Sequence, residues 1–275
     1  MFAALRKTLF GDPREKLLDA LGEAPMPTFP QVANAALDKL RDPTSSLRDV
    51  GLILEQDPGL SIRLLKTVNS PAFGLRRPCT SVAHAASLMG RAQLESMVLA
   101  VAVNAATPKK APGFNRQQFW QAAAQRAAVA RSIAAAISPR FASEAFTAGL
   151  LQDMAVPLLA ARRSDYAPVL EAWRGGEGSL DALEQQAFGW DHAEIGGLLG
   201  ERWEFPAGLK AAVSDHHGVD ADPAVGVVAL IGEDGVDSEK VIEQAHARFG
   251  LAHDVVDKAI QEGSEQAQTL SALWT

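Results

Sequence analysis

Cysteine and aromatic residues are scarce in this sequence. Cys79 is the only cysteine among 275 residues, so the chain can form no internal disulfide and no zinc site built from thiolates. This pattern is typical of a reducing compartment, and we expect a cytoplasmic protein in which Cys79 is a small buried residue. Aromatic residues make up 6% of the chain, so a core would be built mainly from alanine, leucine and valine.

Long hydrophobic runs are also missing. No stretch approaches the roughly 20 consecutive apolar residues that span a bilayer, so we expect no transmembrane segment. Residues 1–10 place apolar side chains at helical spacing beside two cations, but they lack the long apolar centre and cleavage site of a signal peptide. We interpret residues 1–19 as an N-terminal helix. A helix that lies on a membrane surface is the alternative.

Positive charge is not in excess either. The chain has 26 Lys and Arg against 33 Asp and Glu, a formal net charge of −7, which repels a phosphate backbone over most of the surface. Basic residues occur only in isolated pairs such as Arg76-Arg77 and Lys109-Lys110. We therefore expect no nucleic-acid partner. No phosphate-binding loop, dinucleotide fingerprint or nucleophile elbow is present in the sequence.

Apolar residues recur at helical spacing through most of the chain. One clear case predicts a helix over residues 91–106, where apolar side chains share one face: Leu94, Met97, Val98 and Val101. Residues with short side-chain oxygens precede several such segments and are candidate helix caps: Asp57, Ser81, Asp191 and Ser238. The uniformly apolar residues 225–231 fit a strand or a buried helix, and the helical context favours a helix. We therefore predict an all-α fold.

One segment interrupts this pattern. Residues 107–115 contain two prolines, one glycine and two lysines, a composition typical of a loop between packed elements. We expect the chain to break here into an N-terminal and a C-terminal helical lobe.

Three histidines and one aspartate are candidates for a metal site. His192, His216 and His217 flank two consecutive predicted helices and could converge with Asp153. Imidazole and carboxylate ligands suit zinc or another divalent transition metal. On a helix, Asp153 would project about 20° from Phe146, at the rim of the buried face. The alternatives are structural: an ion pair or cap for Asp153, a core histidine bonded to a backbone carbonyl for His216, and a helix-end residue for His217.

Several short segments follow one another in an informative order. They are the proline-rich residues 25–30, the Asp57-Pro58-Gly59-Leu60 helix start, Gly149-Leu150-Leu151-Gln152-Asp153, and the stretch from His192 to His216-His217. Together they resemble the HDOD family, the HD-related output domain of bacterial signal transduction. The resemblance covers residues 20–217 and implies an HD-like domain of many helices. Residues 218–275 lie outside it, and we expect them to form a C-terminal helical extension.

The resemblance also implies that this chain lacks some of the metal ligands of HD hydrolases. Metal-dependent HD hydrolases place an early helical histidine, a His-Asp pair and later histidines around one or two metal ions that activate water. In this chain the first position reads Ala122 and the pair reads Gln152-Asp153. Alanine has no donor atom, and a neutral amide replaces imidazole poorly. Asp153 and the three later histidines would then form a remnant metal pocket, without a cofactor, catalysis or a metal at stoichiometric occupancy.

The expected function is therefore that of a non-catalytic regulatory module. It would bind a signalling protein or a small effector, with a cyclic-dinucleotide pathway as one setting. Asn69 and Ser70, which we place at the junction of the two lobes, are the candidate interaction residues; their alternative role is to stop a helix. The alternative function is a residual metal-dependent phosphohydrolase, such as a cyclic-dinucleotide phosphodiesterase, that uses Asp153, His192 and His216.

Overall fold

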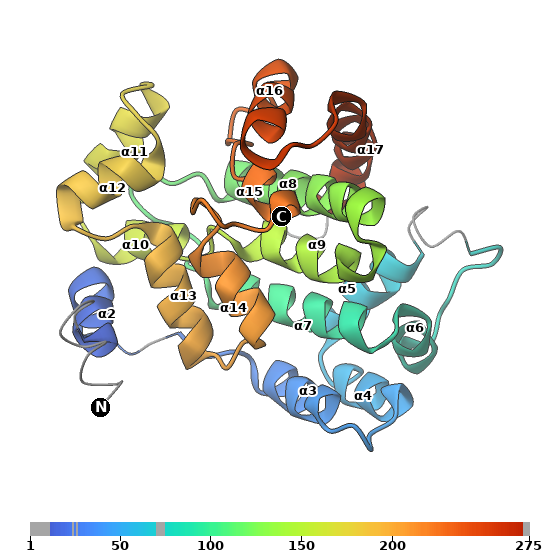
Figure 1. Ribbon diagram of the computed structural model, residues 1–275. Helices are drawn as coiled ribbons and strands as arrows, with labels where there is room; N and C mark the ends of the chain where they lie inside the picture. The colour runs from blue at the N-terminus through green and yellow to red at the C-terminus, as the bar shows by residue number, and fades with distance from the viewer. Residues whose placement is uncertain (1–11, 24, 26, 70–74, 272–275) are drawn as a thin grey trace, which may run out of the picture. The chain divides into compact units, whose positions relative to one another are not determined.

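The computed structural model describes residues 12–23, 25, 27–69 and 75–271 (Figure 1). Within these residues the fold is all-α, as predicted: there is no β-strand, and the only β-pairing is two isolated bridges, Ala111 with Phe114 and Gly232 with Gly235. Every helix in the described part is too short or too polar for a membrane span. Residues 1–11 of the expected N-terminal helix, and hence the proposed membrane-surface segment, lie outside the described residues.

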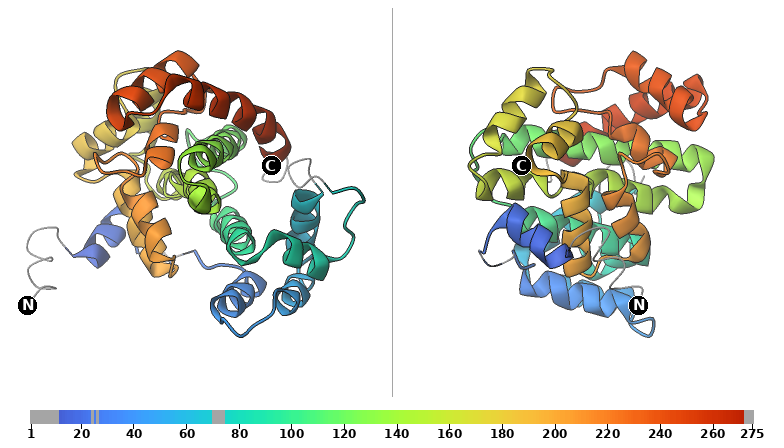
Figure 2. Two further views of the ribbon diagram at one scale, coloured as in Figure 1. Left: turned by 45° about the vertical axis from the view of Figure 1, so that its right-hand side comes forward. Right: turned by 60° about the vertical axis from the view of Figure 1, so that its left-hand side comes forward.

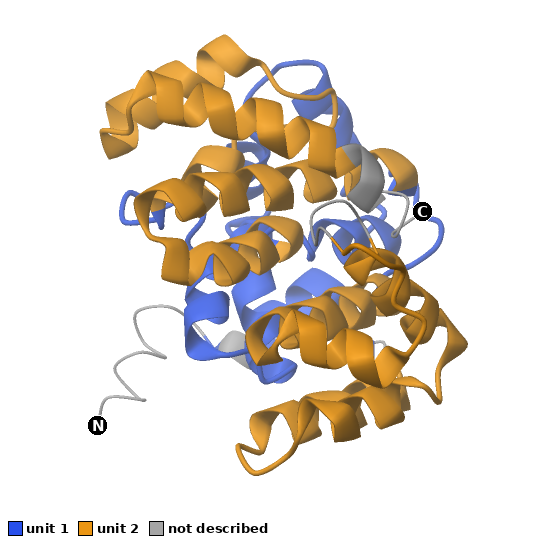
Figure 3. Cartoon of the chain, turned by 90° about the vertical axis from the view of Figure 1, so that its right-hand side faces the viewer, with its two compact units in different colours: residues 1–27, 107–116, 152–222 blue, residues 28–106, 117–151, 223–275 orange. Residues whose placement is uncertain are grey.

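The chain forms two compact units that are interleaved in sequence (Figure 3). Unit 1 takes its described residues from 1–27, 107–116 and 152–222, and unit 2 from 28–106, 117–151 and 223–275. Each unit is therefore assembled from three segments that are separated along the chain.

Unit 1 carries the candidate metal site. Its helices are α2 (Pro13–Leu21), α10 (Val156–Arg162), α11 (Ala167–Arg174), α12 (Leu180–Phe188), α13 (His192–Arg202) and α14 (Ala207–Ser214). Helix α13 packs against α12, α14 and α2. Two glycines of α13 allow its close approach to α14, because a Cβ at Gly197 would lie 2.5 Å from the Cβ of Ser214 and one at Gly196 would lie 3.0 Å from Val213.

Unit 2 is the larger helical assembly. Its helices are α3 (Gln31–Arg41), α4 (Leu47–Leu54), α5 (Pro58–Val68), α6 (Val82–Met89), α7 (Arg91–Ala106), α8 (Arg116–Ile137), the 3₁₀ helix η2 (Pro139–Phe141), α9 (Ala142–Leu151), α15 (Pro223–Val228), α16 (Ser238–Phe249) and α17 (His253–Ser271). Helix α7 has the bounds that its periodicity predicts, and residues 225–228 of the ambiguous apolar segment 225–231 lie in α15, as the preference for a helix predicts.

The C-terminal helices are part of the core of unit 2. One cluster of buried side chains joins α8 and α9 to α15, α16 and α17, and includes Val129, Ile133, Ala145, Val227, Ile231, Val241 and Val256. Figure 2 shows the red helices α16 and α17 beside the green helix α8. Polar contacts fix the same arrangement, since Gln125 donates to the Ser264 hydroxyl at 3.2 Å and Arg126 donates to the Ile231 carbonyl at 3.1 Å. The predicted extension is thus integral to this unit.

The helix caps follow the sequence closely. Asp57, Ser81 and Asp191 are N-caps whose side chains accept hydrogen bonds from backbone N–H groups in the first turn, as predicted. The prediction of Ser238 as a cap is wrong. Asp237 takes that position and accepts from the Lys240 N–H at 3.2 Å, because an aspartate is an equally good acceptor there and precedes the helix by one residue.

Residues 107–116 form part of unit 1. Arg116 donates to the Thr107 hydroxyl at 2.8 Å and to the Pro108 carbonyl at 3.2 Å, while Arg174 of α11 donates to the Gly113 carbonyl. Both units draw on sequence from either side of this segment. The compact units therefore differ in their boundaries from the two contiguous lobes that the sequence predicts.

The close approach of α17 to α8 depends on Gly263. A Cβ at this position would lie 2.8 Å from the backbone nitrogen of Val129 and 2.6 Å from its Cγ2. We predict that Gly263→Ala lowers the free energy of unfolding by about 1–3 kcal/mol, as overpacking does, although alanine raises helix propensity. Urea unfolding measures this, with Glu265→Ala on an exposed position of the same helix as the control. Equal or higher stability of Gly263→Ala would contradict the close packing.

Candidate metal centre

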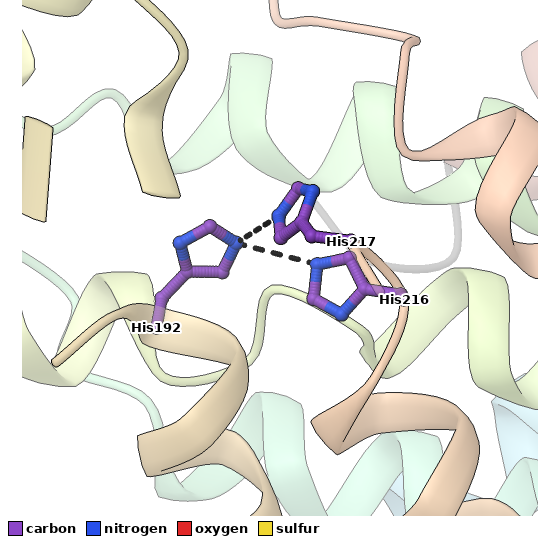
Figure 4. A group of neighbouring side chains, drawn as sticks. All are labelled: His192, His216 and His217. Carbon is purple, nitrogen blue, oxygen red and sulfur yellow. Dashed lines mark hydrogen bonds between the residues drawn. The ribbon is translucent and has the colours of Figure 1, made fainter. Parts of the chain in front are cut away.

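Three histidine side chains converge in unit 1 (Figure 4). His192 is the first residue of α13, and His216 and His217 lie in the turn after α14. The Nε2 atom of His192 is 3.3 Å from Nε2 of His216 and 3.0 Å from Nε2 of His217. Leu209, Ala212, Val213 and His216 follow one another at helical spacing, which predicts that His216 lies on that helix. Instead α14 ends at Ser214, and His216 is buried in the turn that follows.

Asp153 completes this group, but from a different local structure than expected. Its Oδ1 atom is 3.5 Å from Nε2 of His192 and 3.3 Å from Nε2 of His216. The prediction that Asp153 lies on a helix is wrong, because α9 ends at Leu151. Pro157 in the first turn of α10 has no N–H to donate to the Asp153 carbonyl, so one continuous helix through Asp153 into α10 would be kinked or broken.

Hydrogen bonds on the far side of the rings orient two of the histidines. Nδ1 of His216 is 2.8 Å from the Val213 carbonyl oxygen, and a carbonyl only accepts, so Nδ1 must donate. Nδ1 of His192 is 2.6 Å from Oε2 of Glu184, and a carboxylate likewise accepts. In the neutral rings both Nε2 atoms therefore carry lone pairs directed toward one another. The backbone-carbonyl contact suggested for His216 is real and is compatible with metal binding.

Glu184 and Tyr166 belong to the site but were not identified from the sequence. Glu184 is fully buried on α12, where its Oε2 also accepts from the backbone N–H of His192 at 2.7 Å. The Tyr166 hydroxyl donates to Oε1 of the same carboxylate. One sequence signal was available: Glu184 falls one helical turn after the buried Leu180, and a carboxylate on an apolar face needs a partner.

The charges of the pocket shift the protonation of the imidazoles in opposite directions. Burial acts against the charged form of His192, but Glu184 and Asp153 outweigh it and raise its pKa well above the ordinary value. Burial, with repulsion from His216 and His192, lowers the pKa of His217 to about 3. Asp181 is near enough to interact: burial opposes its charged form, yet the Ser179 hydrogen bond and the nearby His217 and His192 lower its pKa.

The spacing of the donor atoms fits one metal ion. A metal bound at about 2.0–2.1 Å to imidazole nitrogens has neighbouring ligand atoms about 2.9–3.4 Å apart, and the four distances measured here are 3.0, 3.3, 3.3 and 3.5 Å. Facing lone pairs also repel unless a proton or a metal ion lies between them. Asp153, His192, His216 and His217 would hold such an ion. The donor nitrogen atoms of the three histidines all lie within 4.8 Å of one another.

Comparison with known proteins identifies the family. The model of the HDOD domain matches residues 26–219, which is more than half of the chain. The protein belongs to the HDOD family. A Treponema pallidum protein of uncharacterized function is 25% identical over 203 residues, which are 71% of this HDOD chain and 39% of that protein. The chain thus spans about two fifths of the length of this curated relative.

Solved structures share the fold. A Shewanella amazonensis protein, provisionally described as a phosphohydrolase, has a TM-score of 0.75 at 22% identity, with 94% of this chain and 98% of that chain covered. A Marinobacter aquaeolei protein, provisionally described as a signal transduction protein, has a TM-score of 0.69 at 19% identity. The match covers 98% of this chain and 66% of that chain. The prediction of an HD-like helical fold is confirmed; likeness at these identities extends to the fold alone.

The two residues at which the resemblance implies missing HD ligands, Ala122 and Gln152, lie in different units. Ala122 is buried on α8 of unit 2 and has no donor atom. Gln152 in unit 1 is 1% exposed, and neither its amide nitrogen nor its amide oxygen has a hydrogen-bond partner among the described residues. Neither residue supplies an imidazole, so the expectation that the second metal position of HD hydrolases is lost stays a prediction. The expectation of no metal at stoichiometric occupancy stays a prediction.

The Gln152 amide is a useful probe of this pocket. A buried polar group without a partner costs about 1–3 kcal/mol, and methionine has a similar shape without the amide. We predict that Gln152→Met leaves the free energy of unfolding unchanged or raises it by up to about 2 kcal/mol. Urea unfolding of the metal-free protein measures this. A clear loss of stability would show that the amide is engaged, and Gln186→Met at an exposed position of α12 controls for the substitution itself.

Of the two candidate interaction residues, Asn69 and Ser70, only Asn69 lies in the described part of the chain. Both ends of the Asn69 side-chain amide bond to the backbone of Cys79: Nδ2 donates to the carbonyl at 2.8 Å, and Oδ1 accepts from the N–H at 2.7 Å. These bonds close the chain between residues 69 and 79 and agree with the structural role of Asn69. Ser70 lies outside the described residues, so a role of this pair in binding a partner stays a prediction.

Proposed function

We propose that this HDOD protein is a regulatory module of bacterial signal transduction, in the cytoplasm, that binds a signalling protein or small effector and does not catalyse hydrolysis. The observation that carries the proposal is the donor set of unit 1. Ring nitrogens of His192, His216 and His217 lie within 4.8 Å of one another, and Oδ1 of Asp153 is 3.5 Å from Nε2 of His192 and 3.3 Å from Nε2 of His216. The family resemblance implies a further histidine in catalytic relatives at the position of Gln152.

The number of ligands favours a structural ion over a catalytic one. Structural zinc sites are closed by four protein ligands, whereas catalytic sites keep three and leave one position open for water. An ion held by all four side chains would have no open position in a tetrahedral arrangement. It would tie the turn that carries Asp153 to the start of α13 and to the turn after α14, and so stabilise unit 1 as a binding module.

A metal-dependent phosphohydrolase is the second candidate. His217 is less buried than His192 and His216, and without it the remaining three side chains would make an open three-ligand site. The Shewanella amazonensis structure with a similar fold carries a provisional phosphohydrolase description. A cyclic dinucleotide is the substrate that this alternative suggests.

Metal titration and a hydrolysis assay separate the two candidates. We expect the full chain to bind one Zn²⁺ or Co²⁺, with affinity at least about tenfold weaker in Asp153→Ala and in His216→Ala. We expect no hydrolysis of a cyclic dinucleotide above the level of Asp153→Ala. The metal content of the protein as purified tests the expected substoichiometric occupancy. Binding of two ions, or hydrolysis that Asp153→Ala abolishes, would instead support the phosphohydrolase.

Partner binding is tested at residues 69 and 70. We predict that proteins cross-linked to the tagged full chain in cells are recovered at least about tenfold less with Asn69→Ala or Ser70→Ala, as for interface residues that contribute strongly. Lys66→Ala, an exposed position on α5, is the control, and melting temperatures show whether each variant is folded. Equal recovery with all variants, together with no thermal shift on adding a cyclic dinucleotide, would contradict this assignment.

A further inference from the structure

Glu184 is the most deeply buried charged side chain near the candidate metal centre. It is 0% exposed, and burial of a carboxylate is costly unless donors surround it. All three donors come from two residues: the backbone N–H of His192 at 2.7 Å, the ring Nδ1 of His192 at 2.6 Å, and the Tyr166 hydroxyl. The carboxylate therefore holds one histidine by both its backbone and its ring.

We propose that Glu184 is a positioning residue that prepares His192 to bind a borderline divalent transition metal, with Tyr166 holding Glu184 in place. The inference rests on the one-ion pocket of the proposed function. A carboxylate that accepts from Nδ1 leaves Nε2 as the donor atom and makes it more basic. Imidazole ligands of this kind suit zinc, cobalt or iron better than magnesium or calcium.

Charge supports the same role. With neutral histidines, a divalent ion at the centre meets the single negative charge of Asp153. Glu184 adds a second negative charge behind His192 without occupying a ligand position, since its oxygen atoms are used by the three donors. A buried centre with balanced charge is less costly than one with a net positive charge.

The surroundings of Tyr166 keep this arrangement rigid. Its ring is fully buried and stacks on Phe188 with centroids 6.0 Å apart, and Phe188 stacks on Trp190 at 4.9 Å. The indole N–H of Trp190 donates to Asp19 of α2 at 2.8 Å. The hydroxyl of Tyr166 is thus directed at Glu184 by packed aromatic rings, and the position of Nε2 of His192 does not depend on a mobile side chain.

The experiment measures the affinity of the full chain for Zn²⁺ and Co²⁺ by competition with a chelator. We expect Glu184→Gln to weaken binding about 10- to 100-fold, as loss of a carboxylate behind a ligating histidine does, and to change the visible absorption of bound Co²⁺. The matched control is Glu171→Gln, which removes one exposed carboxylate from unit 1 and should bind as the wild type does. Thermal unfolding of the metal-free variants separates stability from affinity.

The outcomes are distinct. If Glu184→Gln loses stability but binds both ions as tightly as the wild type, Glu184 is structural and the inference is overturned. If that variant does not fold, Tyr166→Phe, which removes only the hydroxyl, decides: a loss of affinity of about twofold to tenfold supports the inference, and no loss overturns it. A wild type that binds neither ion overturns the ion site as well. Hydrolysis that depends on Asp153, with weakened binding in Glu184→Gln, overturns only the non-catalytic function.

Discussion

Three imidazole rings in unit 1 direct nitrogen atoms toward one point. Hydrogen bonds on the far side of two of these rings fix their orientation. The Val213 carbonyl holds His216, and the Glu184 carboxylate holds His192. Because each outer contact requires a proton on Nδ1, the inner nitrogen atoms of the neutral rings must present lone pairs. A proton between two of these nitrogen atoms, or a metal ion at their centre, removes the repulsion among them. The ring nitrogen atoms can keep these positions only if their surroundings are rigid. The buried Glu184, the aromatic stack around Tyr166 and the close packing of α13 on α14 are consistent with such rigidity.

Several helices, one helix cap and the residues of the candidate site could be predicted from the sequence, each for a physical reason. Helix α7 and the cap of α5 are set by local periodicity and a short-range hydrogen bond, so sequence alone located them. The three histidines and Asp153 were proposed as a group because their residue types share a chemistry. Their local structure was predicted less well, because α9 ends at Leu151 before Asp153 and α14 ends at Ser214 before His216.

Other parts of the fold and of the candidate site depend on contacts between helices, which the spacing of residues along the sequence does not predict. Glu184 and His192 are eight residues apart on different helices, and their contact follows from how α12 packs against α13. In the same way, the apolar face of α17 indicates that the helix is buried but not that Gly263 meets Val129 on α8. Sequence periodicity identifies a face to be covered, whereas the partner that covers it emerges only from tertiary packing.

The core of unit 2 has a consequence for how the family is delimited. The HDOD match ends at residue 219, yet buried side chains of α15, α16 and α17 cover Val129 and Ile133 of α8. A fragment cut at the family boundary would leave that surface of α8 in water, where contiguous apolar area favours self-association. In this protein the span that the family model matches is shorter than the span whose side chains form the core of unit 2.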